Sequence, residues 1–361
     1  MNRSIAVAVS GGVDSMVAAH LLKQETPEVF AIHFRTGFET EPSDRILRRI
    51  QSIGEQLGIP VHLIDLSADF KRQVVDYFAT TYLSGETPNP CVVCNPLIKF
   101  GALLRVSEGL GADVLATGHY ARVRMDYSSG RYRLFKGLDS RKDQSYFLAR
   151  LTQTQLARAC FPLGALTKTA VKEIAAREGL NPTNAEESQD VCFIKAGSYR
   201  QLVASLTGRT PAPGLIETTA GKVLGRHQGL HAFTIGQRRG INCPATEPYY
   251  VVRLDTERNR LVVGHRSDLL ASECRVVRIN WVAPPPAAAL QVRTRVRYRT
   301  PEASCTLTPM EDETAQVQFE APQAAVTPGQ AAVFYDDDEV LGGGFISLSC
   351  ANSKSSLSDA R

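Results

Sequence analysis

A glycine loop close to the N-terminus limits the possible folds more than any other segment of this sequence. The loop, Ser10-Gly11-Gly12-Val13-Asp14-Ser15, follows the continuously apolar run Ile5–Val9. Val13–Lys23 then carries apolar residues at helical spacing. The apolar run fits a strand that is buried on both faces, as in a parallel sheet. A buried strand that enters a helix through glycines indicates an α/β domain.

The same alternation continues through the first third of the chain. Strands that alternate with helices predict a parallel sheet with helices on both faces. Ala121–Lys136 breaks the pattern, because alternating residues flank a Ser-Ser-Gly turn, and it is typical of an inserted β-hairpin. The further strands are expected at Val29–Phe34, Val61–Leu66 and Asp113–Thr117, and the helices at Ser43–Leu57, at Phe70–Tyr82 and from the loop Thr87–Pro96 to about Leu110.

The pattern changes after about Thr207. Pro211, Pro213 and Gly214 mark a linker, and Ala283–Pro286 marks a second boundary. Short, closely spaced strand segments in the last part of the chain suggest a small β-barrel. We therefore expect an N-terminal domain over residues 1–206, a small central domain over 207–282, and a C-terminal β-barrel over 283–361 that ends in a disordered tail.

The composition excludes several classes of protein. A net charge of +4 over 361 residues gives little support by itself for nucleic-acid binding. The chain has no run of about 18 apolar residues, so no transmembrane helix is expected. Met1–Val9 lacks the features of a secretory signal, so a cytoplasmic location without membrane association is expected. The 8 cysteines of a long, reduced chain do not indicate a disulfide framework.

The glycine loop has the properties of an anion site. Two glycines let the backbone approach an anion closely, and N–H groups at a helix N-terminus point toward negative oxygens. Ser10 and Ser15 add hydroxyl donors, and Asp14 beside a phosphate implies a bridging Mg²⁺. The loop lacks the Gly-x-x-x-x-Gly-Lys-Ser/Thr pattern of kinase-like P-loops. It resembles the PP-loop of ATP pyrophosphatases, and a turn that only caps a helix is the alternative.

Two segments carry cysteines in unusual settings. Cys94 ends the segment Thr87–Cys94 where a helix is expected to begin, and a helix N-terminus stabilises a thiolate. Lys99 follows in that helix and adds positive charge. Cys192 lies in an apolar stretch after a polar loop. Three interpretations stay open: inert buried thiols, a pair of sulfur-carrying or redox thiols, and a zinc site, which would need four ligands.

Eight segments, in order and over nearly the whole chain, resemble the bacterial tRNA-specific 2-thiouridylases. One such motif would be weak support, whereas eight in the family's order are specific. They are Ser10–Ser15, Thr87–Asn95, Ala116–Tyr120, Lys142–Leu148, Cys192–Ile194, His227–Gly229, Thr234–Gly240 and Ala325–Gln330.

The resemblance implies a role for each matching position. The N-terminal domain becomes the PP-loop ATP-binding catalytic domain, and the central domain helps to bind tRNA. Cys192 matches the cysteine that carries a persulfide, and Cys94 matches the partner that attacks it or closes a disulfide with it. The positions that match ATP contacts are Ala8, Val9, Ser10, Gly11, Gly12, Val13, Asp14, Ser15, Phe34 and Gly118. Those that match contacts to the target base or to tRNA are Asn89, Pro90, Cys91, His119, Lys142, Asp143, Gln144, Arg297, Tyr298 and Gln330.

Cys91 departs from the family pattern, in which well-known members have an aspartate. A thiol does not replace a carboxylate as an acid or base, because its ordinary pKa is about 8.5 against about 3.9. The aspartate is then dispensable, or Cys91 acts differently. One alternative is that Cys91, Cys94 and Cys192 ligate three irons of an iron–sulfur cluster and leave one iron open for a sulfide.

Basic residues are concentrated in a predicted strand, Gln291–Arg299. Arg293, Arg295, Arg297 and Arg299 would share one face of it and suit a phosphate backbone. A solvated edge strand is the alternative. His227–Gly240 is a second basic stretch.

The resemblance implies an ATP-dependent sulfur transfer. The C2 oxygen of the wobble uridine in tRNA for Lys, Glu and Gln is adenylated, and sulfur from a Cys192 persulfide replaces it. A cysteine desulfurase or sulfur-relay protein must load Cys192 with sulfur. The alternatives are another PP-loop enzyme that acts on a small acid, and an RNA-binding module with a relict nucleotide site.

Overall fold

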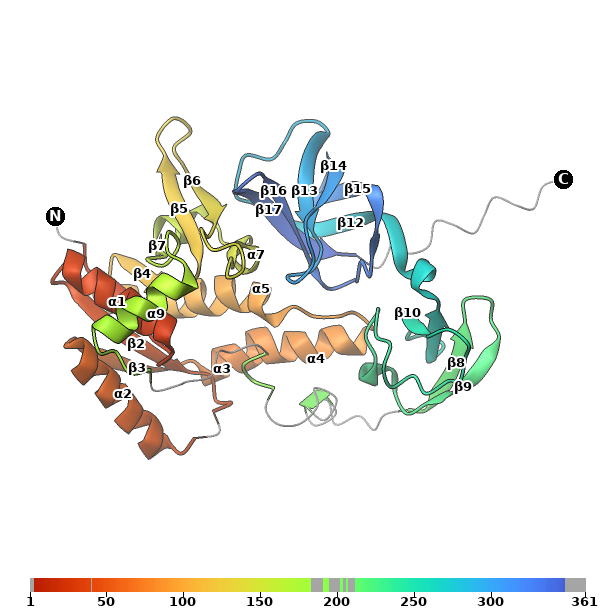
Figure 1. The fold of residues 1–361 in the computed structure, drawn as a ribbon, viewed down its shortest axis with the longest axis horizontal. Coiled ribbons are helices and arrows are strands. Elements are labelled where there is room, and N and C mark those ends of the chain that lie inside the picture. The colour runs from red at the N-terminus through yellow and green to blue at the C-terminus, as the bar shows by residue number, and fades with distance from the viewer. Residues whose placement is uncertain are drawn as a thin grey trace.

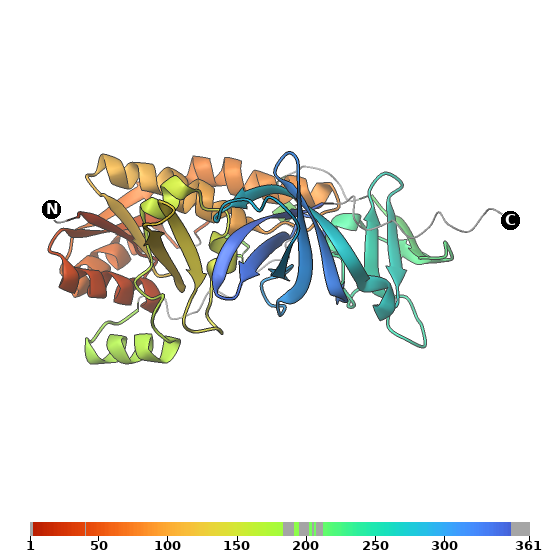
Figure 2. The same ribbon diagram turned by 90° about the horizontal axis from the view of Figure 1, so that it is seen from above.

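Three regions follow one another along the molecule. The computed structural model describes residues 3–39, 41–182, 191–194, 202, 203, 206 and 212–347. The N-terminal α/β domain lies at one end, the C-terminal barrel in the middle, and the small central domain at the other end (Figures 1 and 2). The barrel therefore lies between two regions that precede it in sequence.

The α/β domain contains a five-stranded parallel sheet, as predicted. Its order is β3 (Val61–Asp65), β2 (Val29–Arg35), β1 (Ile5–Ala8), β4 (Val114–Thr117) and β7 (Ala159–Cys160). Successive residues of β1 enter different cores, Ala6 on one face and Val7 on the other. The expected layers of helix on both faces are confirmed.

Each face of the sheet is covered by its own helices. Helices α1 (Val13–Glu25), α2 (Ser43–Leu57) and α9 (Lys168–Arg177) contribute to the core that contains Val7. The opposite core is formed by two longer helical runs, each with a π-helical turn in the middle. These runs are α3 (Ser67–Phe70), η1 (Lys71–Val75) and α4 (Asp76–Leu83), and α5 (Pro90–Cys94), η2 (Asn95–Leu103) and α6 (Leu104–Gly109).

The run Pro90–Gly109 is long and apolar enough to cross a membrane by length and composition alone. Most of its apolar window, 67%, is nevertheless buried against the rest of the protein. A buried core helix meets the same criteria, and its side chains here fill the core around Ile98 and Leu103.

The predicted hairpin is present, but it belongs to a larger sheet than expected. β5 (Ala121–Asp126) and β6 (Arg131–Lys136) pair with each other, and β6 pairs with β17 (Glu339–Ile346) of the barrel. The hairpin therefore joins the α/β domain to the barrel. The short helices α7 (Ser145–Leu148) and α8 (Gln153–Ala157) follow it.

The C-terminal barrel begins earlier than the sequence suggested. β12 (Leu270–Trp281) pairs with both β15 and β17 and so closes the barrel. We accordingly propose a boundary before Leu270 in place of the one expected at residue 283. Pro284–Pro286 lies in the loop that connects β12 to the next barrel strand. The remaining barrel strands are β13 (Leu290–Arg295), β14 (Ala303–Met310), β15 (Thr314–Ala324) and β16 (Ala331–Asp336).

The central domain is a small sheet with the order β10-β11-β8-β9. The apolar segments Tyr249–Leu254 and Leu261–Val263 predict two paired strands, which β10 and β11 confirm, whereas β8 and β9 have no clear signal in the sequence. The boundary after residue 206 and the tail expected to be disordered lie outside the described residues. The four strands are β8 (Gly214–Thr218), β9 (Val223–His227), β10 (Tyr250–Asp255) and β11 (Arg260–Gly264).

Candidate active site

The glycine loop is shaped by its two serines. Gly11 has φ of 81°, and Gly12 is the N-cap of α1. The Ser10 N–H donates to Ser15 Oγ at 3.2 Å, and Ser15 Oγ donates to the Gly12 carbonyl at 2.9 Å. Both hydroxyls therefore hold the turn in which the backbone N–H groups gather at the start of α1, as an anion site requires.

The predicted nucleotide residues meet at one edge of the sheet. Ala8 pairs with Ile32 of β2 and with Thr117 of β4, so the loop after β1, Phe34 and Gly118 all lie at the carboxyl ends of adjacent parallel strands. This edge is where open α/β sheets bind ligands. The sequence did not indicate His33, whose Nδ1 lies 2.8 Å from the Val9 carbonyl and fixes the start of the loop. Burial lowers the pKa of His33 and favours the neutral ring.

Gly118 allows β4 to end directly against the start of α1. A Cβ atom at this position would lie 3.0 Å from the Asp14 carbonyl carbon and 3.0 Å from the Ser15 nitrogen. Backbone atoms cannot move aside as a flexible side chain can. The absence of a side chain at Gly118 is therefore a requirement of the loop geometry.

Asp14 is held by two residues that the sequence did not single out. Lys168 Nζ lies 2.8 and 2.7 Å from the two carboxylate oxygens, and the Tyr120 hydroxyl donates to one of them at 2.7 Å. Asp139 accepts the Lys168 backbone N–H at 2.9 Å, and Gln144 exchanges two hydrogen bonds with the Tyr120 backbone. A buried lysine from α9 therefore supplies positive charge at the anion site.

Cys94 does not occupy the helix N-terminus that the sequence suggested. α5 begins at Pro90 with Asn89 as N-cap, so Cys91 lies in the first turn and Cys94 at the last residue of α5. Burial raises the pKa of the Cys94 thiol to about 12, and Lys99 opposes this shift. The expected stabilisation of a thiolate by a helix N-terminus is therefore absent, and desolvation favours the neutral Cys94 thiol in the free protein.

The segment around Cys192 is anchored by its neighbour, Phe193. The Phe193 ring is buried and makes edge contacts with Phe70 and Phe78, at centroid distances of 5.6 and 5.2 Å. These partners belong to the helical run that precedes the Cys94 helix. Phe193 thereby brings Cys192 into the neighbourhood of Cys94.

The thiols of Cys91, Cys94 and Cys192 form one cluster. Cys91 and Cys192 reach solvent, whereas Cys94 is partly buried. Cys94 and Phe193, the neighbour of Cys192, pack in the same hydrophobic core, and in agreement with this both Cys192 and Cys91 raise the pKa of Cys94. Enough protein surrounds Cys192 to raise its pKa to about 11, although its side chain is accessible. Cysteines nearly 100 residues apart in sequence therefore converge.

Phe193→Ala is expected to release the Cys192 segment from the α/β domain. Removal of a fully packed phenylalanine ring lowers the free energy of unfolding by about 3–5 kcal/mol. Here the removal should destabilise mainly the packing of the Cys192 segment on the domain. The rate at which an oxidant links Cys94 to Cys192 should fall at least about tenfold, whereas Phe193→Leu should retain most of it. Peptide mapping of the disulfide measures this rate, and an unchanged rate in Phe193→Ala would show that the anchor is unnecessary.

Among the residues that the structure describes, no group of three or more His, Cys, Asp or Glu side chains is arranged to hold a metal ion. No cluster-dependent step is therefore derived.

Two of the residues predicted to contact RNA make hydrogen bonds within the protein. Asp143 is buried and accepts the N–H groups of Gly137 and Ser145, each at about 3 Å. Gln330 Nε2 donates to the carbonyls of Thr87 and Pro88, at 3.0 and 3.1 Å, and so fixes the loop before Cys91. In this conformation Asp143 holds the turn before α7, and Gln330 holds the loop before α5.

The predicted row of four arginines is wrong. β13 ends at Arg295, so Arg297 and Arg299 lie beyond the strand. Arg295 pairs with Glu302 at 2.8 Å, and Arg297 donates to the Ile235 carbonyl and to Thr327 Oγ1 at 3.1 and 3.0 Å. Arg297 thereby ties the central domain to the barrel. Tyr298 packs its ring on Phe147, with centroids 4.3 Å apart.

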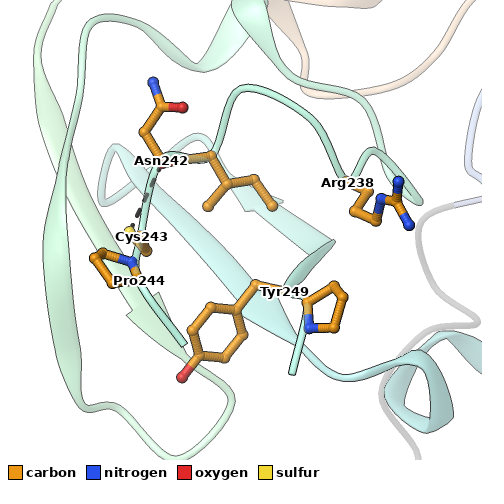
Figure 3. Close-up of a pocket in the computed structure, with 7 residues that line it drawn as sticks. Arg238, Asn242, Cys243, Pro244 and Tyr249 are labelled. Carbon is orange, nitrogen blue, oxygen red and sulfur yellow. Dashed lines mark hydrogen bonds between the residues drawn. The ribbon is translucent and has the colours of Figure 1, made fainter. Parts of the chain in front are cut away.

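The central domain has an open hollow of about 420 Å³, apart from the thiols and the glycine loop. Figure 3 shows the Tyr249 ring on one side of it and Arg238 on another. Arg238 and Arg239 are exposed, as a basic surface requires, whereas His227 is buried and its pKa is lowered by burial. The residues that line the hollow are Arg238, Ile241, Asn242, Cys243, Pro244, Pro248 and Tyr249.

Comparison with known proteins agrees with this architecture. Three family models match successive parts of the chain. They are described as a tRNA methyl transferase HUP domain over residues 3–196, a tRNA methyl transferase PRC-barrel domain over 206–265, and an aminomethyltransferase beta-barrel domain over 271–346. The last match begins close to the start of β12.

Curated relatives match over nearly their full length. A protein of Desulfosudis oleivorans named tRNA-specific 2-thiouridylase MnmA is 52% identical over 345 residues, which cover 96% of this chain and 95% of the relative. Proteins of the same name from Geotalea uraniireducens and Syntrophotalea carbinolica are 43% and 45% identical, with coverage of 99% and 96% of this chain and 98% and 99% of theirs. At this identity and coverage, the chain belongs to the tRNA-specific 2-thiouridylase family of ATP-using sulfurtransferases.

Proposed function

We propose that this protein adenylates the C2 oxygen of the wobble uridine in tRNA for Lys, Glu and Gln, and replaces it with sulfur carried as a persulfide on Cys192. The observation that carries the proposal is that Cys94 and Phe193, the neighbour of Cys192, pack in one hydrophobic core of the domain that carries the glycine loop. His119, which directly follows Gly118 at that loop, contacts Lys99, and Lys99 acts on the thiols. The anion site and the sulfur site are therefore neighbours.

The residues of the glycine loop fit ATP. The gathered N–H groups and the N-terminus of α1 suit the pyrophosphate, and Gly118 lets β4 end directly against the start of α1. Mg²⁺, when bound with ATP, would offset the phosphate charge, and Asp14 is the carboxylate that would contribute a ligand. Lys168 must then release Asp14, which frees an ammonium beside the phosphates. Phe34 and Ala8 lie at the same edge, where the nucleoside would extend.

The first chemical step makes a leaving group. The uridine O2 attacks the α-phosphorus, a P–O bond forms to the base, and the bond to pyrophosphate breaks. The chain's contribution is to hold both partners in line and to stabilise the charge that develops on the departing phosphates. Asn89, Pro90 and Cys91, at the start of α5, are proposed to lie against the base, and the outward flip of that base brings C2 within reach.

The second step transfers sulfur with balanced electrons. The terminal sulfur of the Cys192 persulfide attacks C2, and a C–S bond forms as the C–O bond to AMP breaks. The Cys94 thiolate attacks the inner sulfur of Cys192 and closes a Cys94–Cys192 disulfide, so the transferred sulfur is reduced to the sulfide level. A thiol reductant must reopen the disulfide. A cysteine desulfurase or sulfur-relay protein must reload Cys192, and we place the reaction in the cytoplasm.

The tRNA is proposed to lie across all three regions. Lys142, Gln144 and Tyr298 border the barrel near α7, and the exposed Arg238 and Arg239 extend a basic surface onto the central domain. Phosphate contacts of this kind position the RNA without reading its sequence. The target base is then recognised by residues beside the thiols, at the start of α5.

The direct test is formation of 2-thiouridine. Full-length protein is incubated with ATP, Mg²⁺, a persulfide donor and unmodified tRNA, and nucleosides are quantified by mass spectrometry. Product that requires both ATP and the donor supports the proposal. ATP–pyrophosphate exchange that depends on a small acid, in place of tRNA, would favour a different PP-loop reaction.

Sulfur transfer is expected to accelerate with pH. Burial raises the pKa of Cys94 to about 12, so the thiol is almost fully protonated near neutrality, and the reactive thiolate fraction grows about tenfold per pH unit below that value. In single turnovers with preloaded persulfide, the disulfide-forming step should therefore rise by up to about tenfold from pH 7 to pH 8. A flat profile would show that RNA or ATP binding has already ionised the thiol.

A further inference from the structure

Lys99 lies in a π-helical segment that directly follows Cys94. It lies in η2, whose π-helical hydrogen bonds join residues five apart, and it follows Cys94 by five positions. Because a π-helix has more residues per turn than an α-helix, this spacing brings Lys99 closer to the face of Cys94 than an α-helix would. π-Helical turns inside longer helices are frequent at functional sites.

The charge of Lys99 acts on all three thiols. It lowers the pKa of Cys91, Cys94 and Cys192, in each case against the effect of burial. Among the residues that the structure describes, the other charged or titratable groups that act on this cluster are the three thiols themselves and Glu39, which raises the pKa of Cys192. Lys99 therefore favours the thiolate, whereas its neighbours oppose it.

His119 holds the Lys99 ammonium in place. The Lys99 Nζ lies 3.3 Å from His119 Nε2, and Thr117 Oγ1 lies 2.7 Å from His119 Nδ1. An ammonium only donates, so Nε2 must accept and Nδ1 must carry the proton that it donates to Thr117. Burial and the Lys99 charge both lower the pKa of His119, in agreement with a neutral ring.

We propose that Lys99 is the cation that activates Cys94 and Cys192 as thiolates, and that His119 is a positioning residue, fixed by Thr117, that directs the Lys99 ammonium at them. The proposal rests on the proposed function, and it reassigns His119 from a tRNA contact to the support of sulfur chemistry. The thiol proton leaves to solvent, and Lys99 stays charged. The arrangement also makes His119 a physical link between the glycine loop and the thiols.

The test is the pH profile of iodoacetamide alkylation at each cysteine of the full chain, followed by mass spectrometry without ATP or tRNA. Lys99→Met is expected to slow alkylation of Cys94 about tenfold at pH 8, since one pKa unit changes the thiolate fraction tenfold. Lys99→Arg keeps the charge and should stay close to wild type. Cys160 and Cys243, which lie outside the cluster, are internal references whose profiles should not change.

His119 is tested by a conservative pair. His119→Gln retains an acceptor for Lys99 and should keep the wild-type profile, whereas His119→Leu and Thr117→Val should move it toward that of Lys99→Met. Faster alkylation of Cys160 would report unfolding of a variant. If His119→Leu unfolds in this way, the Cys94 profile of Thr117→Val, which is close to isosteric, provides the test. Tenfold weaker tRNA binding by His119→Leu with an unchanged alkylation profile would overturn the proposal.

An unchanged pH profile of Cys94 alkylation in Lys99→Met would also overturn the proposed role of Lys99. These outcomes are independent of thiolation. Wild-type protein that forms no 2-thiouridine but shows the expected alkylation shifts would refute the proposed function alone.

Discussion

Cys192→Ser is expected to lower 2-thiouridine formation by at least about 1,000-fold while ATP-dependent release of pyrophosphate with tRNA continues. A serine hydroxyl cannot carry a sulfane sulfur, so the second step has no donor, whereas the glycine loop is untouched. Nucleoside mass spectrometry and a pyrophosphate assay separate the two steps. Cys94→Ser should have a similarly large effect on product in reactions supplied with persulfide alone.

Cys160→Ser and Cys243→Ser provide matched controls. They make the same chemical change at thiols outside the cluster, and each should retain product formation within about twofold. Normal thiolation by Cys192→Ser would mean that the persulfide lies elsewhere, for example on Cys91. Loss of pyrophosphate release in Cys192→Ser would mean that adenylation of the uridine also requires the Cys192 thiol.

Gly118→Ala is expected to weaken ATP binding by about 10- to 100-fold. The added methyl would lie 3.0 Å from backbone atoms of Asp14 and Ser15, so the start of α1 must shift away from β4. Overpacking of this kind costs about 1–3 kcal/mol, which corresponds to that range of affinity if the cost falls on the loop. Calorimetric titration with Mg²⁺ and a non-hydrolysable ATP analogue measures the effect.

Gly109→Ala is the control for that substitution. Gly109 lies in α6, and a Cβ there meets nothing within 4 Å, so alanine should be neutral or stabilising by up to about 1 kcal/mol. Equal ATP affinities for Gly118→Ala and wild type would show that the loop tolerates the shift, and that the close approach of β4 to α1 is not required for nucleotide binding.

Local patterns were sufficient to predict the glycine loop and the strand and helix on either side of it. The apolar run before the loop, the two glycines and the helical spacing after it define β1, the turn and α1, because each depends on neighbours in sequence. The carboxyl edge of a parallel sheet then brings Phe34 and Gly118 to the loop. Lys168 was missed because its role depends on the packing of α9 against α1, for which one lysine gives no signal.

Tertiary context overrode local patterns elsewhere. Val292 and Thr294 alternate with arginines and are buried in the barrel, but this alternation could not show that the strand ends at Arg295 or that Arg295 and Arg297 have partners in the protein. The Ala-Pro-Pro-Pro segment looked like a domain boundary, yet it is a loop between two strands of one barrel. Convergence of Cys94 with Cys192 depends on a ring, Phe193, that packs among aromatic residues more than 100 positions away.

The most direct test of the central claim is a single turnover by protein loaded with one persulfide on Cys192, mixed anaerobically with ATP, Mg²⁺ and unmodified tRNA in the absence of reductant and free sulfide. The account predicts up to one 2-thiouridine per protein and, with the same time course, one peptide pair joined through residues 94 and 192. Thiolated tRNA formed while both of these thiols remain free would contradict it.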